Sequence, residues 1–278
     1  MNTPLTLGHS PDSDDAFMFY GLATGRVDTQ GLAFDHILRD IQTLNDWARE
    51  GRLDCTAISV HAYPYVADRY AIMSHGASMG DGYGPMVVAR APMSVNELQE
   101  RTIAVPGELT SAFLALSLFL PGRFRYEVVP FDAILDAVSA GRVDAGLIIH
   151  EGQLTHETMG LVKLVDLGAW WRSETGLPLP LGVNCIRRDM PAALRSRVSE
   201  VLHASIRCGL EHREEALAHA MRYARDMSID VADRFVGMYV NEWTLDMGEK
   251  GRDSIRLFLE RGAERGLTPR VEQIEFVD

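Results

Sequence analysis

Three short segments of this chain combine hydroxyl, carboxylate and imidazole groups at spacings that suit a small-molecule site. The first, residues 9–17, reads His-Ser-Pro-Asp-Ser-Asp-Asp-Ala-Phe and stands where a predicted strand passes into a predicted helix. Ser and Asp accept hydrogen bonds from the free N–H groups of a first helical turn, so helix capping explains any single one of these acids. Three carboxylates exceed what one cap needs. We therefore predict that Ser10 and Asp14 face a ligand.

The second segment, residues 105–113, reads Val-Pro-Gly-Glu-Leu-Thr-Ser-Ala-Phe and leads from a strand into a very apolar helix. The free N–H groups of a helix N-terminus, with the hydroxyls of Thr110 and Ser111 beside them, suit a carboxylate or a phosphate. A plain N-cap explains the same residues equally well. The Gly-Lys-Ser/Thr element of a Walker loop is missing from the sequence, so nucleotide hydrolysis is not indicated.

The third segment places His150 at the end of the apolar run 147–149 and before Glu151. Imidazole titrates near neutral pH and suits proton abstraction, which makes His150 the candidate catalytic base. A lone histidine is more often structural, and that alternative stays open on the residues alone. Glu151 either orients the ring or is solvated.

A fourth segment holds the pair Trp170 and Trp171, followed by the proline-rich run 175–182. The tryptophans either stack on an aromatic ligand or wedge two lobes together. The prolines restrict the run to an extended crossing, which suits a hinge beside a pocket wall.

The elements that must position these segments alternate between strand and helix, which predicts an α/β fold with parallel sheets built from βαβ units. The predicted strands are 4–8, 33–38, 53–60, 71–73, 85–89, 102–105, 126–129 and 144–150. The predicted helices are 14–24, 41–50, 110–120, 131–140, 192–210, 215–225 and 254–265.

Two similar units follow one another along the chain. Glu-Gly-Arg-Leu-Asp at 50–54 precedes a strand that ends near Ser59, and Ala-Gly-Arg-Val-Asp at 140–144 precedes one that ends at His150. Ligands of open α/β sheets lie outside the carboxyl ends of the strands, so we expect both side chains to face one cleft between two lobes. The helical tail from about Pro191 packs back on the first lobe. This predicts a discontinuous first lobe, 1–90 plus 184–278, and a second lobe, 91–183, with crossings near 89–92 and 181–185.

Composition narrows the class of ligand. The 278 residues carry a formal net charge of -12, which argues against a nucleic-acid partner but allows a small anionic substrate in a locally positive pocket. Cys55, Cys185 and Cys208 are far apart and show no zinc or disulfide spacing, so we expect free thiols and no metal.

No apolar run approaches the ~18 residues that span a bilayer. The first residues lack the features of a signal peptide, which predicts a cytoplasmic protein without membrane contact.

In their order, these motifs resemble the 1,4-dihydroxy-6-naphthoate synthases of the futalosine route to menaquinone. The similarity covers nearly the whole chain, through the segments Leu7-Gly-His-Ser-Pro, Leu147–Glu151, Val165–Gly182, Tyr239-Val-Asn and Leu245-Asp-Met-Gly. The resemblance implies a type II periplasmic-binding-protein-like fold with its active site in the interlobe cleft. It implies a lyase that converts cyclic dehypoxanthinyl-futalosine to 1,4-dihydroxy-6-naphthoate and dihydroxyacetone, with no metal or redox cofactor.

The same resemblance assigns roles to individual residues. His150 matches the family's proton acceptor, and the matched substrate-binding residues are Thr110 and Ser111 together with Thr56, Ala57, Ile58 and Ser59. This sequence departs from the family's pattern in two places, the segment 10–17 and residue 57. The first motif often reads Ser-Pro-Cys-Pro-Asn-Asp-Thr-Phe in the family, and the residue after Thr56 is often lysine, whereas Ala57 offers no cation for a substrate carboxylate.

Two alternatives share the expected fold. One is the chorismate dehydratase of the same pathway, and the other is a non-catalytic solute-binding protein for a small carboxylate. A binding protein of that kind should carry an export signal, which the sequence lacks, and the His150-Glu151 strand end resembles the synthase more closely.

Overall fold

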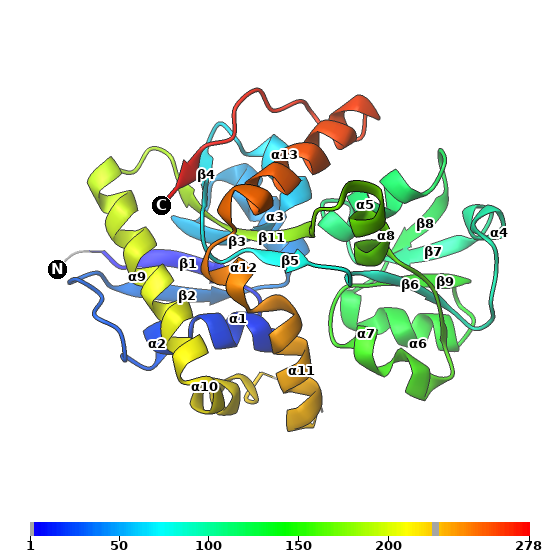
Figure 1. Ribbon diagram of the computed structural model, residues 1–278, viewed down its shortest axis with the longest axis horizontal. Helices are drawn as coiled ribbons and strands as arrows, with labels where there is room; N and C mark the ends of the chain where they lie inside the picture. Colours follow the sequence, from blue (N-terminus) through cyan, green and yellow to red (C-terminus); the bar gives the residue numbers. More distant parts are fainter. Residues whose placement is uncertain (1–2, 224–227) are drawn as a thin grey trace.

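Two β-sheets organise the protein, and the chain passes twice between them (Figure 1). The structure is a computed structural model that describes residues 3–223 and 228–278. In the first sheet the strand order is β12-β4-β11-β3-β1-β2, with β5 paired to β11; in the second it is β10-β6-β9-β7-β8. This arrangement confirms the predicted α/β class.

The strands of the first sheet are β1 (Leu5–His9), β2 (Phe34–Leu38), β3 (Cys55–Ser59), β4 (Tyr70–Met73), β5 (Ser78–Gly80), β11 (Leu179–Arg187) and β12 (Phe276–Val277). Those of the second sheet are β6 (Met86–Ala89), β7 (Thr102–Val105), β8 (Arg125–Val128), β9 (Ala145–Ile148) and β10 (Val162–Asp166).

The helices before the second crossing are α1 (Ser13–Met18), α2 (Tyr20–Ala23), α3 (Ile41–Glu50), α4 (Val95–Gln99), α5 (Ser111–Phe119), α6 (Ile134–Ser139), α7 (Gly152–Thr155) and α8 (Leu167–Thr175). The tail adds α9 (Ala192–Glu211), α10 (Arg213–Ala220), α11 (Ile229–Tyr239), α12 (Glu242–Leu245) and α13 (Gly248–Glu264). Short 3₁₀ turns span Val60–Tyr65, Phe131–Ala133 and His156–Met159.

Local sequence signals explain where the best-predicted helix starts and stops. The predicted helix 41–50 is α3, which begins after Asp40, whose carboxylate accepts the N–H of Thr43 at 3.0 Å. It ends at Gly51, which adopts the left-handed conformation (φ +68°) that glycine tolerates best.

Only part of each sheet is parallel. β1 pairs in parallel with β2 and β3, and β7 with β8 and β9, as the βαβ pattern predicts. However, β6 runs antiparallel to β9 and β10, and β11 runs antiparallel to β3, β4 and β5. The prediction of purely parallel sheets is therefore wrong, because these two strands enter from the other lobe and not through a βαβ crossover.

The same two strands show where the chain changes sheet. β6 belongs to the second sheet, and β11 to the first. The changes therefore fall between Gly80 and Met86, and between Asp166 and Leu179. Both come earlier than the predicted crossings near 89–92 and 181–185, because hydrophobic periodicity does not reveal which sheet a strand joins.

Two predicted elements end earlier than expected. The predicted helix 14–24 is interrupted at Phe19, between α1 and α2. The predicted strand 144–150 ends at Ile148, so that His150 lies in the turn after β9. The backbone N–H of Gln153 donates to the carbonyl of His150 at 2.8 Å, which bends the chain into α7. The predicted helix 215–225 also ends early, because α10 spans Arg213–Ala220 and residues 221–223 form a turn; residues 224 and 225 lie outside the described part of the chain.

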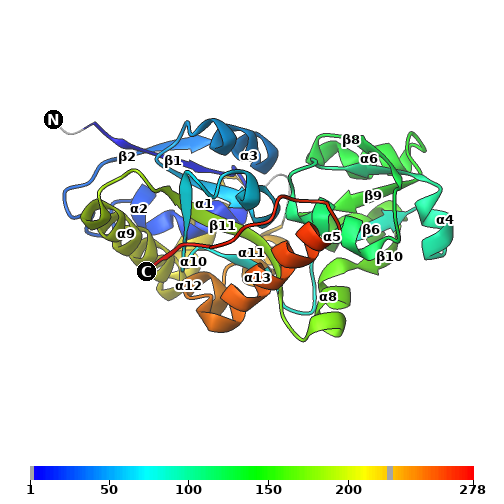
Figure 2. The same ribbon diagram turned by 90° about the horizontal axis from the view of Figure 1, so that it is seen from above.

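The tail helices pack on the first sheet's side of the molecule, as predicted. α9 contacts α2, and α10 and α11 contact α1 (Figures 1 and 2). Apolar residues of these helices, such as Val201 and Ala216, share a core with Phe17 and Met18 of α1. The helices that follow β1 are therefore covered by a segment far along the chain.

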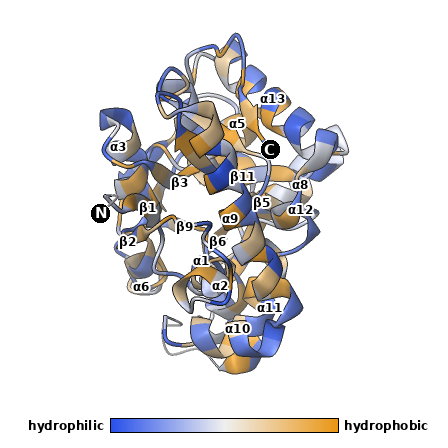
Figure 3. Ribbon diagram, turned by 90° about the vertical axis from the view of Figure 1, so that its left-hand side faces the viewer, coloured by the Kyte–Doolittle hydropathy of each residue, from blue (hydrophilic) through white to orange (hydrophobic). Residues whose placement is uncertain are grey.

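A second, larger core joins the two lobes along one side. It includes Leu114 of α5, Trp171 of α8 and Phe258 of α13, all fully buried. The rings of Trp171 and Phe258 pack edge to face at 5.3 Å, and the indole N–H donates to Ser254 Oγ at 3.3 Å. In Figure 3, α5 is mainly hydrophobic, as expected of a helix buried between lobes. Trp171 therefore wedges the lobes together, in agreement with one of its two predicted roles.

Among residues 3–223 and 228–278, no helix is both long enough and apolar enough to cross a membrane.

Trp171→Ala should lower the free energy of unfolding by about 3–5 kcal/mol, because it empties a large site in the shared core. Urea unfolding followed by circular dichroism measures the change. The neighbouring Trp170→Ala is the matched control, since Trp170 is only partly buried, against Phe119. Equal losses in the two variants would contradict the role given to Trp171.

Candidate active site

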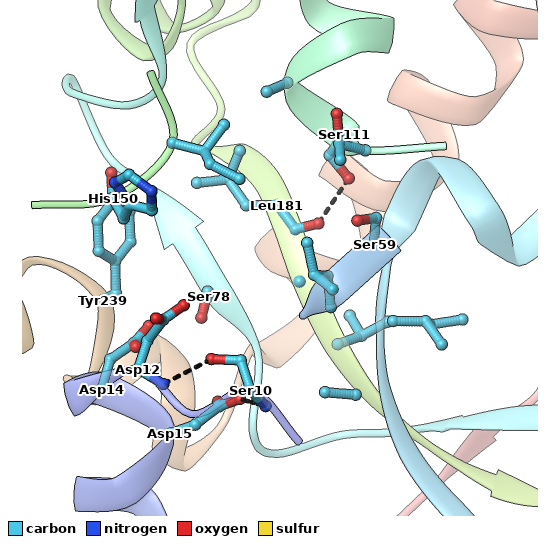
Figure 4. A pocket seen from close by; sticks show the side chains of 18 of the residues that line it. Ser10, Asp12, Asp14, Asp15, Ser59, Ser78, Ser111, His150, Leu181 and Tyr239 are labelled. Atoms are coloured by element: carbon cyan, nitrogen blue, oxygen red, sulfur yellow. Dashed lines mark hydrogen bonds between the residues drawn. The ribbon is translucent and has the colours of Figure 1, made fainter. Parts of the chain in front are cut away.

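A cleft of about 890 Å³, part of it open to solvent, lies between the two sheets (Figure 4). Most of the predicted site residues line it, namely Ser10, Asp14, Ala57, Ile58, Ser59, Thr110, Ser111 and His150. Thr56 is absent from the lining. Its side chain is buried beside Gly8 in the first sheet, and its hydroxyl donates to the carbonyl of Ala57 at 3.0 Å.

Carboxyl groups form one wall of the cleft, at the start of α1, where Asp15 is buried and Asp14 is half-buried. Asp15 Oδ2 accepts the backbone N–H of Ser10 at 2.6 Å, and Ser10 Oγ accepts the N–H of Asp12 at 3.0 Å. Burial raises the pKa of Asp15 to about 7, against the opposing effect of the Ser10 N–H bond. Burial, together with the neighbouring charges of Asp15 and Asp12, raises the pKa of Asp14 well above its ordinary value. Burial thus disfavours the charged form of both carboxyl groups, and in its protonated form a carboxyl group donates a hydrogen bond to an oxygen atom of a ligand.

Ser59 is fixed by a side chain that the sequence analysis did not select. Asn45 of α3 is fully buried; its amide nitrogen donates to Ser59 Oγ at 3.1 Å, and its amide oxygen accepts the Ser59 N–H at 2.8 Å. The same nitrogen donates to the carbonyl of Leu109 in the other lobe at 3.4 Å. Asn45 lies four residues after Ile41, on the apolar face of the predicted helix. A polar residue on that face is the sequence signal that could have identified Asn45 as a buried hydrogen-bonding residue.

The hydroxyls of Thr110 and Ser111 are used inside the protein. Thr110 Oγ1 accepts the N–H of Phe113 at 3.2 Å and donates to the carbonyl of Gly107 at 2.8 Å, which is the N-cap alternative left open above. Ser111 Oγ donates to the carbonyl of Leu181 at 2.5 Å and accepts the N–H of His61 at 3.2 Å.

These bonds leave backbone donors at the start of α5. Among the described residues, the N–H groups of Ser111 and Ala112 have no hydrogen-bond acceptor, and both residues line the cleft. An anion at this end of the cleft would therefore be held by peptide N–H groups and the helix dipole, without either hydroxyl.

His150 is buried in the opposite wall. The ring of Phe131 packs edge-on against the imidazole with 4.4 Å between ring centroids, and Glu151 Oε2 lies 3.9 Å from Nδ1. The Glu151 side chain is itself mostly buried. Figure 4 shows His150 and Tyr239 together on one side of the cleft, with Ser59 and Ser111 on the other.

The structure adds cleft residues for which the sequence offered little signal. Tyr239 comes from α11, in a segment noted for its resemblance but given no role. Asn184 of β11 is directly opposite Ala57 of β3 in the antiparallel ladder, and its amide nitrogen is buried with no acceptor among the described residues. Strand pairing between residues so far apart in the sequence is not visible from hydrophobic patterns.

The chemical inventory of the cleft is narrow. Its lining, within the described residues, holds no lysine or arginine, and those residues contain no cluster of His, Cys, Asp and Glu that could bind a metal ion. The cleft offers one imidazole, carboxyl groups whose pKa values are raised by burial, hydroxyls and peptide N–H donors. This set suits proton transfer on a small molecule that has several oxygen atoms and one anionic group.

Comparisons with known proteins agree with a biosynthetic role. A family model described as menaquinone biosynthesis matches residues 5–264. A 1,4-dihydroxy-6-naphthoate synthase from Thermus thermophilus is 45% identical over 264 residues, and one from Streptomyces coelicolor is 40% identical over 270; each alignment covers 95% of both chains.

Solved structures show the fold. A crystal structure from Archaeoglobus fulgidus superposes with a TM-score of 0.91 at 43% identity, covering 95% of this chain and 98% of that one. A Candida albicans protein described as having the generic periplasmic binding protein fold superposes with a TM-score of 0.70 at 12% identity, covering 98% and 99%. The predicted periplasmic-binding-protein-like fold is confirmed.

Asp15→Asn should change the pH dependence of stability. The unfolded chain releases the Asp15 proton near pH 4, whereas the folded protein keeps it to about pH 7. The wild-type free energy of unfolding therefore falls as the pH rises between those values. The asparagine has no proton to release and still accepts the Ser10 N–H. The variant should therefore gain stability relative to wild type between about pH 4.5 and about pH 7.5 in urea unfolding. A difference independent of pH would show that Asp15 ionises normally.

Thr110→Val should lower the free energy of unfolding by about 1 kcal/mol, because it removes the N-cap of α5. It should also raise KM, since the cap holds the Ser111 and Ala112 N–H groups in place. Thr110→Ser keeps the capping oxygen and is the control. If the valine variant matches the serine variant in both urea unfolding and KM, the cap does not support the anion-binding end of the cleft.

Proposed function

The chain belongs to the menaquinone biosynthesis family, and on that premise we propose that it is a 1,4-dihydroxy-6-naphthoate synthase. It is a carbon–carbon lyase that converts cyclic dehypoxanthinyl-futalosine to 1,4-dihydroxy-6-naphthoate and dihydroxyacetone. The observation that carries the proposal is the position of His150, buried in a cleft whose lining also includes the carboxyl groups at the start of α1 and the first residues of α5.

The walls of the cleft suggest how the substrate is oriented. Its carboxylate binds at the start of α5, where the N–H groups of Ser111 and Ala112 and the helix dipole replace the missing cation. Its hydroxylated, sugar-derived part then lies against Ser10, Asp14 and His150, since a protonated carboxyl group donates hydrogen bonds to alcohol oxygens.

Proton transfer is the chemistry that these residues provide. His150 removes a proton from the sugar-derived part, and carbon–carbon and carbon–oxygen bonds break as the new ring becomes aromatic. Asp14, protonated before the reaction, donates to an oxygen on which negative charge develops. Glu151 stabilises the imidazolium that forms, as the 3.9 Å distance to Nδ1 allows.

The two alternatives receive less support. Chorismate dehydration and solute binding without catalysis both fit the fold, but both curated relatives carry the synthase name. Because these relatives are biosynthetic enzymes, we place the reaction in the cytoplasm, with a small anionic substrate as the partner.

His150→Ala should reduce kcat by at least about 100-fold while the protein stays folded, because general-base catalysis is worth about 10² to 10⁴. Purified protein is incubated with cyclic dehypoxanthinyl-futalosine, and naphthoate is followed by absorbance and fluorescence. His203→Ala is the control, since His203 stacks on His75 away from the cleft.

Near-normal turnover by His150→Ala would remove the base assignment. If the wild-type protein leaves the cyclic substrate intact and dehydrates chorismate, the dehydratase alternative replaces the proposal.

A further inference from the structure

The two lobes are joined very differently on the two sides of the cleft. On one side α5, α8 and α13 share a continuous apolar core. On the other side, α11 of the first lobe lies beside α7 of the second (Figure 1). There Tyr239 Oη donates a hydrogen bond to Gln153 Oε1 at 2.7 Å. One side is thus held by extensive packing, while this part of the other side is held by a polar contact.

Both partners of this bond are buried and tied to their own lobes. Tyr239 packs edge-on against Phe235 at 5.2 Å and Tyr83 at 5.9 Å, which holds its ring on the first lobe. Gln153 stands at the start of α7, and its backbone N–H donates to the carbonyl of His150 at 2.8 Å. A single residue thus connects the interlobe bond to the turn that carries the imidazole.

We propose that the Tyr239–Gln153 hydrogen bond is a latch that closes the cleft and sets the position of His150 for proton transfer. The effect of the latch on proton transfer rests on the proposed function, whereas its role in closing the cleft does not. Tyr239 and Gln153 are positioning residues, and neither removes a proton from the substrate.

The strength of this contact suits a bond that must open for substrate and product. One neutral hydrogen bond changes a closed-to-open ratio by a factor of about ten, because water replaces the lost partner on opening. An apolar interface of the size seen around Trp171 would not open so readily. Placing a weak bond opposite a packed side lets the lobes part at the latch and stay joined at the core.

Tyr239 lines the cleft. A loss of activity in a Tyr239 variant could therefore come either from the broken latch or from a lost contact with the substrate. Gln153 resolves this, because it is absent from the lining among the described residues and still holds the other half of the bond. Gln153→Met keeps the side chain's length and removes the acceptor. It also removes a buried amide nitrogen that has no acceptor among the described residues, which offsets part of the cost of leaving the buried Tyr239 hydroxyl without its acceptor.

Steady-state kinetics of Tyr239→Phe, Gln153→Met and the double variant test the kinetic part. Each single variant should lower kcat by about 10- to 100-fold with KM changed less than about threefold, because a small displacement of the base slows the chemical step. The double variant should lose no more than the worse single variant, since both changes break one bond. Tyr70→Phe is the matched control: it removes a buried tyrosine hydroxyl that donates to Leu53 within the first lobe, and it should leave kcat unchanged.

Hydrogen exchange without substrate tests closure independently of activity. Peptides that span 150–160 should exchange faster in Tyr239→Phe and in Gln153→Met than in wild type or Tyr70→Phe, because the latch no longer holds α7. Unchanged exchange in both latch variants overturns the proposal. So does a loss of kcat in Tyr239→Phe that Gln153→Met does not share, which would make Tyr239 a substrate contact. If the wild-type enzyme does not turn over the cyclic substrate, the proposed function fails, and exchange alone decides the latch.

Discussion

The placement of α5 between the two sheets is the constraint on which the rest of the site depends. The body of this helix is almost entirely apolar and must be covered on all sides, so it packs into the core that joins the lobes. Its N-terminus faces the cleft, where Thr110, Ser111 and Ala112 are part of the lining. The polar bonds around that end follow from this position, since Ser111 connects the helix to the carbonyl of Leu181 and the N–H of His61 in the other lobe.

This constraint also bears on how an acidic protein would accommodate the anionic substrate proposed above. The formal net charge is -12, and the cleft lining within the described residues contains no basic side chain other than His150. A helix N-terminus offers oriented N–H groups whose partial positive charge needs no counter-ion. The carboxyl groups of the α1 wall do not oppose an anion as strongly as their number suggests, because burial keeps Asp14 and Asp15 protonated to higher pH.

The two lobes are held together around the cleft by two kinds of contact. Dense apolar packing around Trp171 and Phe258 keeps the lobes in register, whereas the contact between Tyr239 and Gln153 is polar. Asn45 adds a further polar contact between the lobes, because its amide bonds both to Ser59 and to the Leu109 carbonyl in the loop before α5. Under the proposed function and the proposed latch, a site built in this way holds its binding groups still and leaves movement to the wall that carries His150.

The sequence by itself determined most of the local structure and indicated part of the cleft lining. Alternation of strands and helices predicted the α/β class, capping residues and Gly51 set the bounds of α3, and the predicted strand ends pointed to Ser59 and His150, although β9 stops at Ile148. These succeed because hydrophobic period, caps and strand ends depend on neighbours along the chain.

Tertiary structure alone decided that β6 and β11 exchange sheets, that Asn184 stands beside Ala57, and that Tyr239 reaches Gln153. It also decided that the Thr110 hydroxyl caps a helix and does not line up as a free donor. Each of these depends on contacts between residues that are distant in sequence or on competition for one hydroxyl proton, and neither leaves a local pattern to read.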